Sequence, residues 1–159
     1  MNRSIDFRIT GLPVDPFRRF FDLGDEELAL HNARRYVADA KPGFPCRVSL
    51  IDAEVGERVI LVSYTHHQVN GPYSGSGPVF VRESARVAEL NVNEVPEVVR
   101  HRLISVRAYD ADGLMNQSQV VEGRDVSQVV QEFFANEKVQ YLHLHNAKPG
   151  CYSCRVDRA

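Results

Sequence analysis

Apolar and polar residues alternate over short stretches along most of this chain, and such alternation predicts β-strands. The clearest stretch runs from Val59 to Thr65 and is rich in β-branched residues, which fit a pleated, half-buried surface. The same pattern predicts further strands over residues 7–10, 47–51, 79–82, 103–109, 114–121, 139–145 and 152–156. Asp110-Ala-Asp-Gly113 is a turn signal, so the strands on either side of it are expected to form a hairpin.

Helical spacing of apolar residues is confined to short segments. Residues 25–39 open with three acidic residues, which the helix dipole favours in a first turn, and Pro42 prevents the helix from continuing. Residues 126–134 carry an apolar stripe, and a helical turn is expected over residues 96–101. Strands therefore dominate. The order of elements predicts an α+β fold, with a mainly antiparallel sheet or partial barrel and two or three short helices on one face.

A glycine- and proline-rich segment interrupts the strands at residues 70–78, with three glycines and two prolines. It is too short to link two domains, so we expect a loop or a mobile flap there. A chain of 159 residues has the size of one globular domain, and residues 1–159 are expected to fold as a unit.

The composition is that of an ordinary soluble protein, and it limits the expected partners. Hydrophobic residues make up 43% and charged residues 25% of the chain. The net charge of -2 provides no basic field, so neither nucleic acid nor an anionic membrane surface is an expected partner. Residues 1–20 hold no apolar run of signal-peptide length, and no run elsewhere is long enough to span a membrane. The three cysteines fit a reduced, cytoplasmic protein.

Lysine is rare among the basic residues of this chain. Only Lys41, Lys138 and Lys148 are lysines among the 19 basic residues, and the rest are arginines. A biased genome composition would explain this. The alternative is that several arginines hold planar anions, because a guanidinium offers a rigid fork of donors that matches carboxylate and phosphate.

Side chains on a strand alternate between its two faces, and here this separates apolar from reactive side chains. One face of the expected sheet carries Ile104, Val106, Ala108, Leu142 and Leu144. The other carries Ser105, Arg107, Tyr109, Tyr141, His143 and His145, and Tyr64 and His66 lie together on another strand. Antiparallel sheets often have a solvated outer face, but lysine, glutamate and threonine usually fill it. The residue types therefore favour one ligand-binding surface.

His143-Leu-His145 has the spacing of two metal ligands on one strand. Residues two apart on a strand project in parallel, about 6.5–7 Å apart at the backbone, so both imidazoles could converge on one ion. A third ligand could come from His66, His67, Cys46, Cys151 or Asp110. Two other interpretations stay open: neutral histidines that act as acid, base or anion ligand, and histidines that only pack. The sequence does not specify a cofactor.

Cys151-Tyr-Ser-Cys154 has the CxxC spacing of redox and zinc motifs. The redox form needs a helix after the first cysteine, and too few residues follow Cys154 to form one. Zinc ribbons need a second pair, and only Cys46 remains. Side chains three apart on a strand point to opposite faces, so no disulfide is expected within the motif. Cys46 and Cys154 are expected to be buried, whereas Cys151 follows the Pro149-Gly150 turn and is a candidate nucleophile.

Four motifs in a fixed order, spanning essentially the whole chain, resemble those of one family. They are Pro45-Cys-Arg-Val-Ser-Leu50, Gly77-Pro-Val-Phe-Val-Arg-Glu83, Arg107-Ala-Tyr-Asp110 and the segment from Tyr141-Leu-His-Leu-His-Asn-Ala to Arg155-Val-Asp-Arg-Ala159. Together they resemble the bacterial family catalogued as domain of unknown function 1203. The resemblance implies a small, stand-alone bacterial protein, and it implies no activity.

The residue types favour an enzyme that acts on a small anionic metabolite. Arg82 and Arg107 could bind carboxylate or phosphate by paired hydrogen bonds, and a histidine could act as general acid or base. The candidate catalytic residues are His66, His143, His145 and Cys151, and the candidate ligand-binding residues are Arg47, Arg82, Arg107, Tyr109 and Asn146. Two alternatives stay open: an anion-binding module without turnover, and a metal-dependent enzyme with His143 and His145 as ligands. No P-loop, dinucleotide-binding fingerprint, GxSxG or HExxH motif occurs in the sequence.

Overall fold

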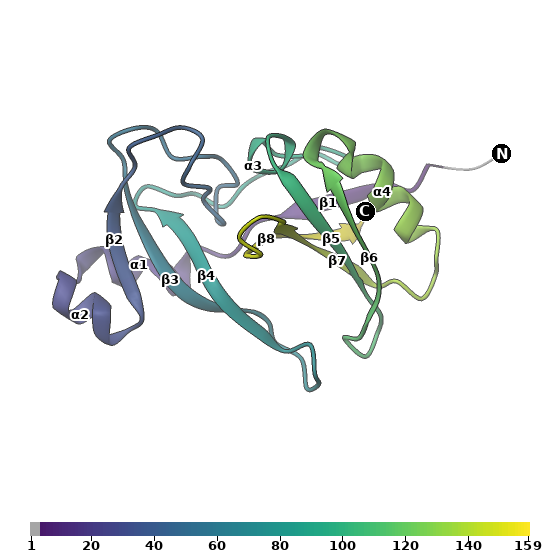
Figure 1. Ribbon diagram of the computed structural model, residues 1–159, viewed down its shortest axis with the longest axis horizontal. Helices are drawn as coiled ribbons and strands as arrows, with labels where there is room; N and C mark the ends of the chain where they lie inside the picture. Colours follow the sequence, from purple (N-terminus) through teal and green to yellow (C-terminus); the bar gives the residue numbers. More distant parts are fainter. Residues whose placement is uncertain (1–3) are drawn as a thin grey trace.

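The computed structural model describes residues 4–159 and contains two antiparallel sheets (Figure 1). The larger sheet, on the right of Figure 1, has five strands in the order β1-β8-β7-β5-β6, and the smaller has three in the order β2-β3-β4. The predicted α+β class with mainly antiparallel pairing is confirmed, and the two sheets stay open rather than closing into a barrel.

The strands and helices are short. The strands are β1 (Phe7–Thr10), β2 (Ala33–Val37), β3 (Arg58–His67), β4 (Gly75–Arg82), β5 (Leu103–Tyr109), β6 (Met115–Glu122), β7 (Tyr141–Asn146) and β8 (Tyr152–Arg158). The helices are α1 (Asp15–Arg18), α2 (Asp25–Leu30), α3 (Glu97–Arg100) and α4 (Val126–Phe134), with 3-10 turns η1 (Arg19–Asp22) and η2 (Gly123–Asp125). No helix within residues 4–159 has the length and apolarity needed to cross a membrane.

The larger sheet buries its apolar face under α4, which crosses that sheet in Figure 1. The alternation predicted for β5 and β7 is confirmed, since the apolar residues assigned to one face all lie in this core. The helix contributes Val126, Val129, Val130, Phe133 and Phe134. Covering one face in this way leaves the opposite face, with its histidines, tyrosines and Arg107, free to meet the smaller sheet.

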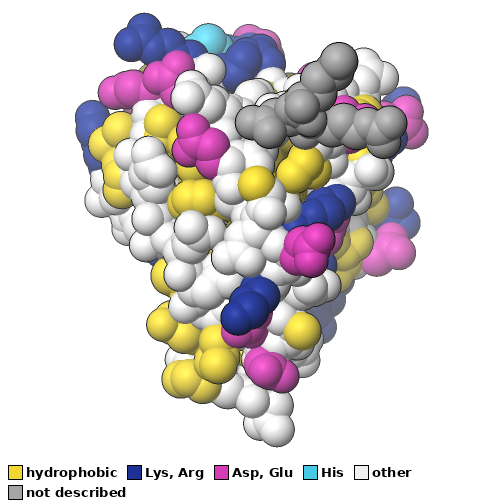
Figure 2. Space-filling view, turned by 90° about the vertical axis from the view of Figure 1, so that its right-hand side faces the viewer, with side chains coloured by type: hydrophobic (Ala, Val, Ile, Leu, Met, Phe, Trp, Pro, Cys, Tyr) yellow, Lys and Arg dark blue, Asp and Glu magenta, His cyan; other side chains and the backbone are white. Residues whose placement is uncertain are grey.

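The smaller sheet has its own core beneath the helices at the amino-terminal end. Phe17, Phe20 and Leu28 pack with apolar side chains of β3 and β4. Helices therefore cover both sheets rather than a single face. Figure 2 shows a face of the molecule on which acidic and basic side chains are interspersed, as a net charge of -2 leads one to expect.

The prediction of one helix over residues 25–39 is wrong, because the helix ends at Leu30 and β2 follows. Asn32 has a φ of 54°, a left-handed conformation that ends the helix. Ala33 and Arg35 then pair with β3. Sheet pairing overrides the helical spacing of the sequence, as tertiary contacts commonly do.

The predicted strand over residues 47–51 is also wrong. Isolated bridges at Pro45, Cys46 and Asp52 flank a tight turn in which Leu50 has a φ of 56°. The segment instead lies between the sheets, where the amide of Arg47 donates to the carbonyl of Phe80. The expected loop over 70–78 is shorter than predicted, since β4 already begins at Gly75.

Gly123 lies where β6 meets η2, and its backbone packs closely against that of Val99. A Cβ at this position would lie 1.8 Å from the carbonyl oxygen of Val99, which is backbone and cannot move aside. We expect Gly123→Ala to lower the free energy of unfolding by about 3 kcal/mol. The control is Gly71→Ala, because a Cβ there would have no neighbour within 4 Å. Urea denaturation measures both variants, and equal stabilities would contradict the prediction.

Candidate functional site

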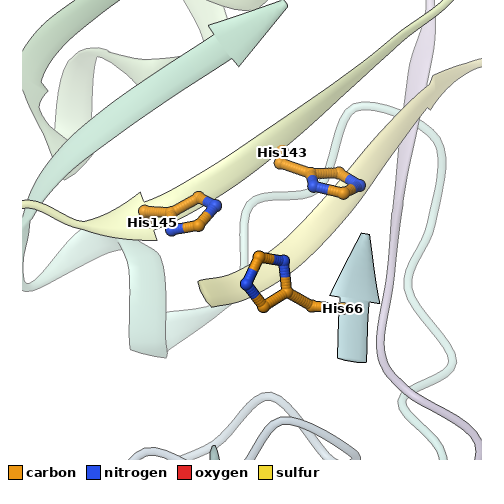
Figure 3. A group of neighbouring side chains, drawn as sticks. All are labelled: His66, His143 and His145. Atoms are coloured by element: carbon orange, nitrogen blue, oxygen red, sulfur yellow. The ribbon is translucent and has the colours of Figure 1, made fainter. Parts of the chain in front are cut away.

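Three histidines from the two sheets meet where the polar face of the larger sheet lies against the end of β3 (Figure 3). His143 and His145 project from β7 and are each 2% exposed. His66 comes from β3, and its ring centroid lies 6.2 Å from that of His143 and 5.3 Å from that of His145. We call these three residues the histidine cluster.

A β-bulge aims His66 at the larger sheet. The β3–β4 register shifts between Thr65 and His67, so His66 is the extra residue. Consecutive side chains of a regular strand point to opposite faces. The bulge lets the rings of both His66 and His67 approach His143. Gly75 leaves room for this, since a Cβ there would lie 3.2 Å from Cε1 of His66.

Each ring of the histidine cluster has one buried nitrogen that has no hydrogen-bond partner within residues 4–159. These atoms are Nδ1 of His66, Nδ1 of His143 and Nε2 of His145. The three residues each offer one ligand atom, and these atoms lie within 4.8 Å of one another. Figure 3 shows the rings facing a common point from two strands. Buried polar atoms are rarely left unpaired, so these three nitrogens make the histidine cluster the candidate site.

The tautomer of His145 is fixed by the backbone. Its Nδ1 lies 3.0 Å from the carbonyl oxygen of Gly150. Because a carbonyl only accepts, Nδ1 carries the proton, and the lone pair stands on Nε2, which faces the cluster. The turn that presents this carbonyl requires glycine, since Gly150 has a φ of 83°. A backbone carbonyl behind the ring is the arrangement that orients metal-binding histidines.

His67 is excluded from this role because both of its nitrogens are occupied. Nδ1 lies 2.7 Å from the carbonyl oxygen of Tyr73, and Nε2 lies 2.6 Å from the hydroxyl of Tyr141. The ring therefore donates through Nδ1 and accepts from the tyrosine hydroxyl. His67 instead packs against the cluster, with its ring centroid 4.9 Å from that of His143.

Burial keeps the histidine cluster neutral. It lowers the pKa of His143 to about 2, and the neighbouring histidines, His67 first, add to the effect. Burial also lowers the pKa of His145 to about 4, although the hydrogen bond to Gly150 opposes this. The pKa of His66 is lowered by burial and then by the charges of His67 and Arg107. Neutral imidazoles with free lone pairs are what a metal ion requires.

Arg107 and Tyr109 lie on β5 beside the histidine cluster. Arg107 pairs in register with His143, and its Nε donates to Oγ of Ser105 at 3.2 Å. Within the part of the chain that the structure describes, Arg107 forms no salt bridge. The ring of Tyr109 lies 5.2 Å from that of His143, and burial raises the pKa of its hydroxyl. A half-buried guanidinium without a carboxylate suits an anionic ligand.

Three other candidates, Arg47, Asn146 and Cys151, form a second group. They line a cavity of about 720 Å³ between the sheets. His66 lines the same cavity, so the cavity touches both groups. Nη2 of Arg47 donates to Sγ of Cys151 at 3.0 Å, and Nδ2 of Asn146 lies 3.6 Å from the same sulfur. The three cysteines of the chain are free.

Arg82 is not brought to either group. Its Nε and Nη2 donate to the two carboxylate oxygens of Glu57, at 2.8 and 3.1 Å. This bidentate ion pair uses the fork that an anionic ligand would need. Tyr64 is also drawn away, since its ring packs on Phe17 with centroids 5.2 Å apart.

Tyr152 belongs to the site although the sequence did not single it out. Its ring stacks on His66, with centroids 5.0 Å apart and an interplanar angle of 5°. Its backbone pairs with His145 across β7 and β8. Residues paired across two strands share a face, so the pairing with His145 would have placed Tyr152 in the site. The sequence alone does not show that β7 and β8 are adjacent.

The neutral histidines make the stability of the metal-free protein depend on pH. In the unfolded chain a histidine takes up a proton below about pH 6.5, whereas folded His143 and His145 do so only near 2 and 4. The unfolded state therefore binds more protons between about pH 6.5 and 4, and stability is lost as the pH falls. We expect a slope of about 1.4 kcal/mol per pH unit for each of the two histidines.

Urea denaturation in the presence of a chelator, over about pH 4 to 7, measures this slope. His145→Asn removes one titrating group and should reduce the slope by about 1.4 kcal/mol per pH unit. His31→Asn is the matched control, because His31 is exposed and lies outside the cluster. Identical slopes in wild type and both variants would contradict the prediction.

The comparisons with known proteins place the chain in a family but give it no activity. No curated protein and no solved structure matches it. A family model described as "Protein of unknown function (DUF1203)" matches residues 43–158, which include His66, His143, His145 and Arg107. The match confirms the resemblance given by the four sequence motifs. The chain therefore belongs to the DUF1203 family.

Proposed function

We propose that this chain is a metal-dependent enzyme in which the histidine cluster holds a divalent transition-metal ion and Arg107 binds a small anionic substrate. One observation carries the proposal: three histidines from two sheets bring one ligand atom each to within 4.8 Å of one another, and each ring has a buried nitrogen without a hydrogen-bond partner in the described chain. Leaving a buried acceptor unpaired costs about 1–3 kcal/mol. One ion would satisfy all three nitrogens at once.

The ligand set indicates the class of metal. Imidazole suits Zn²⁺, Cu²⁺, Fe²⁺ and Ni²⁺, whereas Mg²⁺ and Ca²⁺ require oxygen ligands. Three protein ligands leave a coordination position open, as in catalytic zinc sites. Zinc–nitrogen bonds of about 2.0–2.1 Å put tetrahedral ligand nitrogens about 3.4 Å apart. The ligand atoms of the three histidines lie within 4.8 Å of one another, which is compatible with this spacing.

The charges around the cluster favour an anionic substrate. Neutral imidazoles leave the charge of a divalent ion uncompensated. No carboxylate joins the three-residue group in the described chain, and Arg107 adds a further positive charge. A carboxylate or phosphate would receive hydrogen bonds from the Nη atoms of Arg107 and also balance the ion.

The protein side chains have separate parts in the proposed reaction. A divalent ion in such a site supplies Lewis acidity. Arg107 orients the substrate anion, and Ser105 holds the guanidinium in place through Nε. Tyr109 and Tyr141 stack with centroids 5.4 Å apart and close one side of the cluster. Tyr152 covers His66 and limits the access of water.

Metal binding is the direct test of the cluster. Calorimetric titration of chelator-treated protein with Zn²⁺ and Co²⁺ should give one equivalent bound. We expect His66→Ala, His143→Ala and His145→Ala to weaken binding by about 100-fold or more, because each removes one of three ligands. Exposed His31→Ala is the control and should bind like wild type.

Two results would overturn the metal proposal. One is a wild-type protein that binds neither ion. The other is a set of variants that remain folded by circular dichroism and bind as tightly as wild type. His66→Ala decides the matter if substitution of the more buried histidines prevents folding, because His66 is only partly buried.

Arg107 is tested with anions rather than with the metal. In the zinc-loaded protein, thermal shift over inorganic phosphate, acetate and citrate should find an anion that raises the unfolding midpoint. Arg107→Ala should weaken the binding of that anion by about tenfold or more without weakening zinc binding. The control is Arg124→Ala, since Arg124 is exposed and remote from the cluster. Equal anion binding by both variants would remove Arg107 from the proposal.

A further inference from the structure

The cavity between the sheets contains a second group of reactive side chains that the metal proposal does not use. Its volume of about 720 Å³ lies within the range of small-molecule sites, about 300–1,000 Å³. The carboxyl end of β7 and the turn after it contribute Asn146, Lys148 and Cys151 to the wall, and Arg47 lies behind the sulfur.

Arg47 is a buried cation without an acidic partner. It is 2% exposed and forms no salt bridge within residues 4–159. Its Nε donates to the carbonyl of Tyr152 at 2.8 Å, its Nη1 to the carbonyl of Pro45 at 2.6 Å, and its Nη2 to Sγ of Cys151 at 3.0 Å. Among these partners, only the sulfur can become an anionic group. Burial lowers the pKa of the guanidinium, because a cation removed from water is unfavourable unless an anion lies beside it.

Asn146 gives an independent sign that a ligand binds beside this sulfur. It is 4% exposed, and its Nδ2 lies 3.6 Å from Sγ of Cys151. Its Oδ1 is buried and has no hydrogen-bond partner in the described chain. The site therefore has a positive donor, from Arg47, and a free acceptor, from Asn146. A hydroperoxide fits both, because one oxygen can accept and the O–H can donate.

The other two cysteines differ from Cys151 in their surroundings. Cys46 and Cys154 are fully buried, and burial raises the pKa of Cys154 to about 12. Cys151 is half-buried and lines the cavity. Cys154 lies in the core beneath α4, so it is not placed to form a disulfide with an oxidised Cys151.

We infer that Cys151 is a peroxide-reactive thiol, with Arg47 and Asn146 as the groups that hold the hydroperoxide. An electron pair of the sulfur attacks the nearer peroxide oxygen, and an S–O bond forms as the O–O bond breaks. The thiol proton passes to the departing oxygen, which leaves as water or an alcohol. The sulfur is oxidised by two electrons to sulfenic acid, and the hydroperoxide is reduced. Because Cys154 is not placed to resolve it, the sulfenic acid is returned to the thiol by an external thiol.

The test uses the whole chain, reduced and treated with chelator. Hydrogen peroxide is added in the presence of dimedone, which traps sulfenic acid, and peptide mass spectrometry locates the adduct. We expect labelling at Cys151 at least about tenfold faster than in the urea-unfolded chain, with Cys46 and Cys154 unlabelled as internal controls. Asn146→Ala and Arg47→Lys should each slow labelling by about tenfold or more, since each removes a contact to the peroxide.

Three outcomes would overturn the inference. One is labelling of Cys151 no faster than in the unfolded chain. Another is an unchanged rate in Asn146→Ala, which decides the matter if Arg47→Lys does not fold. The third is loss of zinc binding by Cys151→Ser, because the thiol would then belong to the metal centre. Labelling at the expected rate in a protein that binds no metal would support this inference while the metal proposal fails, so the two are separable.

Discussion

The buried guanidinium of Arg47 connects the parts of the molecule on which the site depends. Through its main chain, Arg47 donates to Phe80 in the smaller sheet and accepts from Leu12. Through its side chain it donates to Tyr152 in the larger sheet and to Cys151 just before β8. A cation removed from water without a carboxylate is unfavourable unless its hydrogen bonds offset the cost. The two sheets can therefore take few relative positions that keep all these bonds.

The histidine cluster follows from this fixed arrangement of the sheets. His143 and His145 lie on one rigid strand, whereas His66 comes from the end of β3 across the interface. A metal ion held by all three would link the sheets, so its binding free energy would add to the stability of their packing. The bulge at His66 gives that ligand some freedom to adjust, while the Gly150 carbonyl fixes the ring of His145.

The two faces of the larger sheet have different surroundings. The apolar face packs against α4 and forms the main core. The polar face holds neutral, buried imidazoles, and His143 and His145 make folding less favourable as the pH falls, because the unfolded chain takes up protons that these buried rings do not. Sites of this kind commonly give up stability in exchange for reactive groups that are already in position. The shared lining residue, His66, places the cavity with Cys151 next to the histidine cluster.

Local patterns in the sequence were enough to predict the strands of the larger sheet and the separation of its faces. Alternation has a period of two residues, so Arg107, His143 and His145 could be assigned to one face without knowledge of the fold. The same local reasoning failed where a long-range pairing competes. Residues 33–37 have helical spacing, but pairing with β3 makes them a strand. Residues 47–51 alternate, but they turn between the sheets.

The membership of the site was decided by tertiary structure. The sequence offered five possible partners for His143 and His145, and only sheet packing and the bulge select His66. The sequence also suggested Arg82 as an anion-binding residue. No local pattern reveals that the carboxylate of Glu57, 25 residues away, already binds its guanidinium. Alternation fixes the direction of a side chain relative to its own strand. Distances between strands remote in sequence depend on how the two sheets pack, which no local pattern contains.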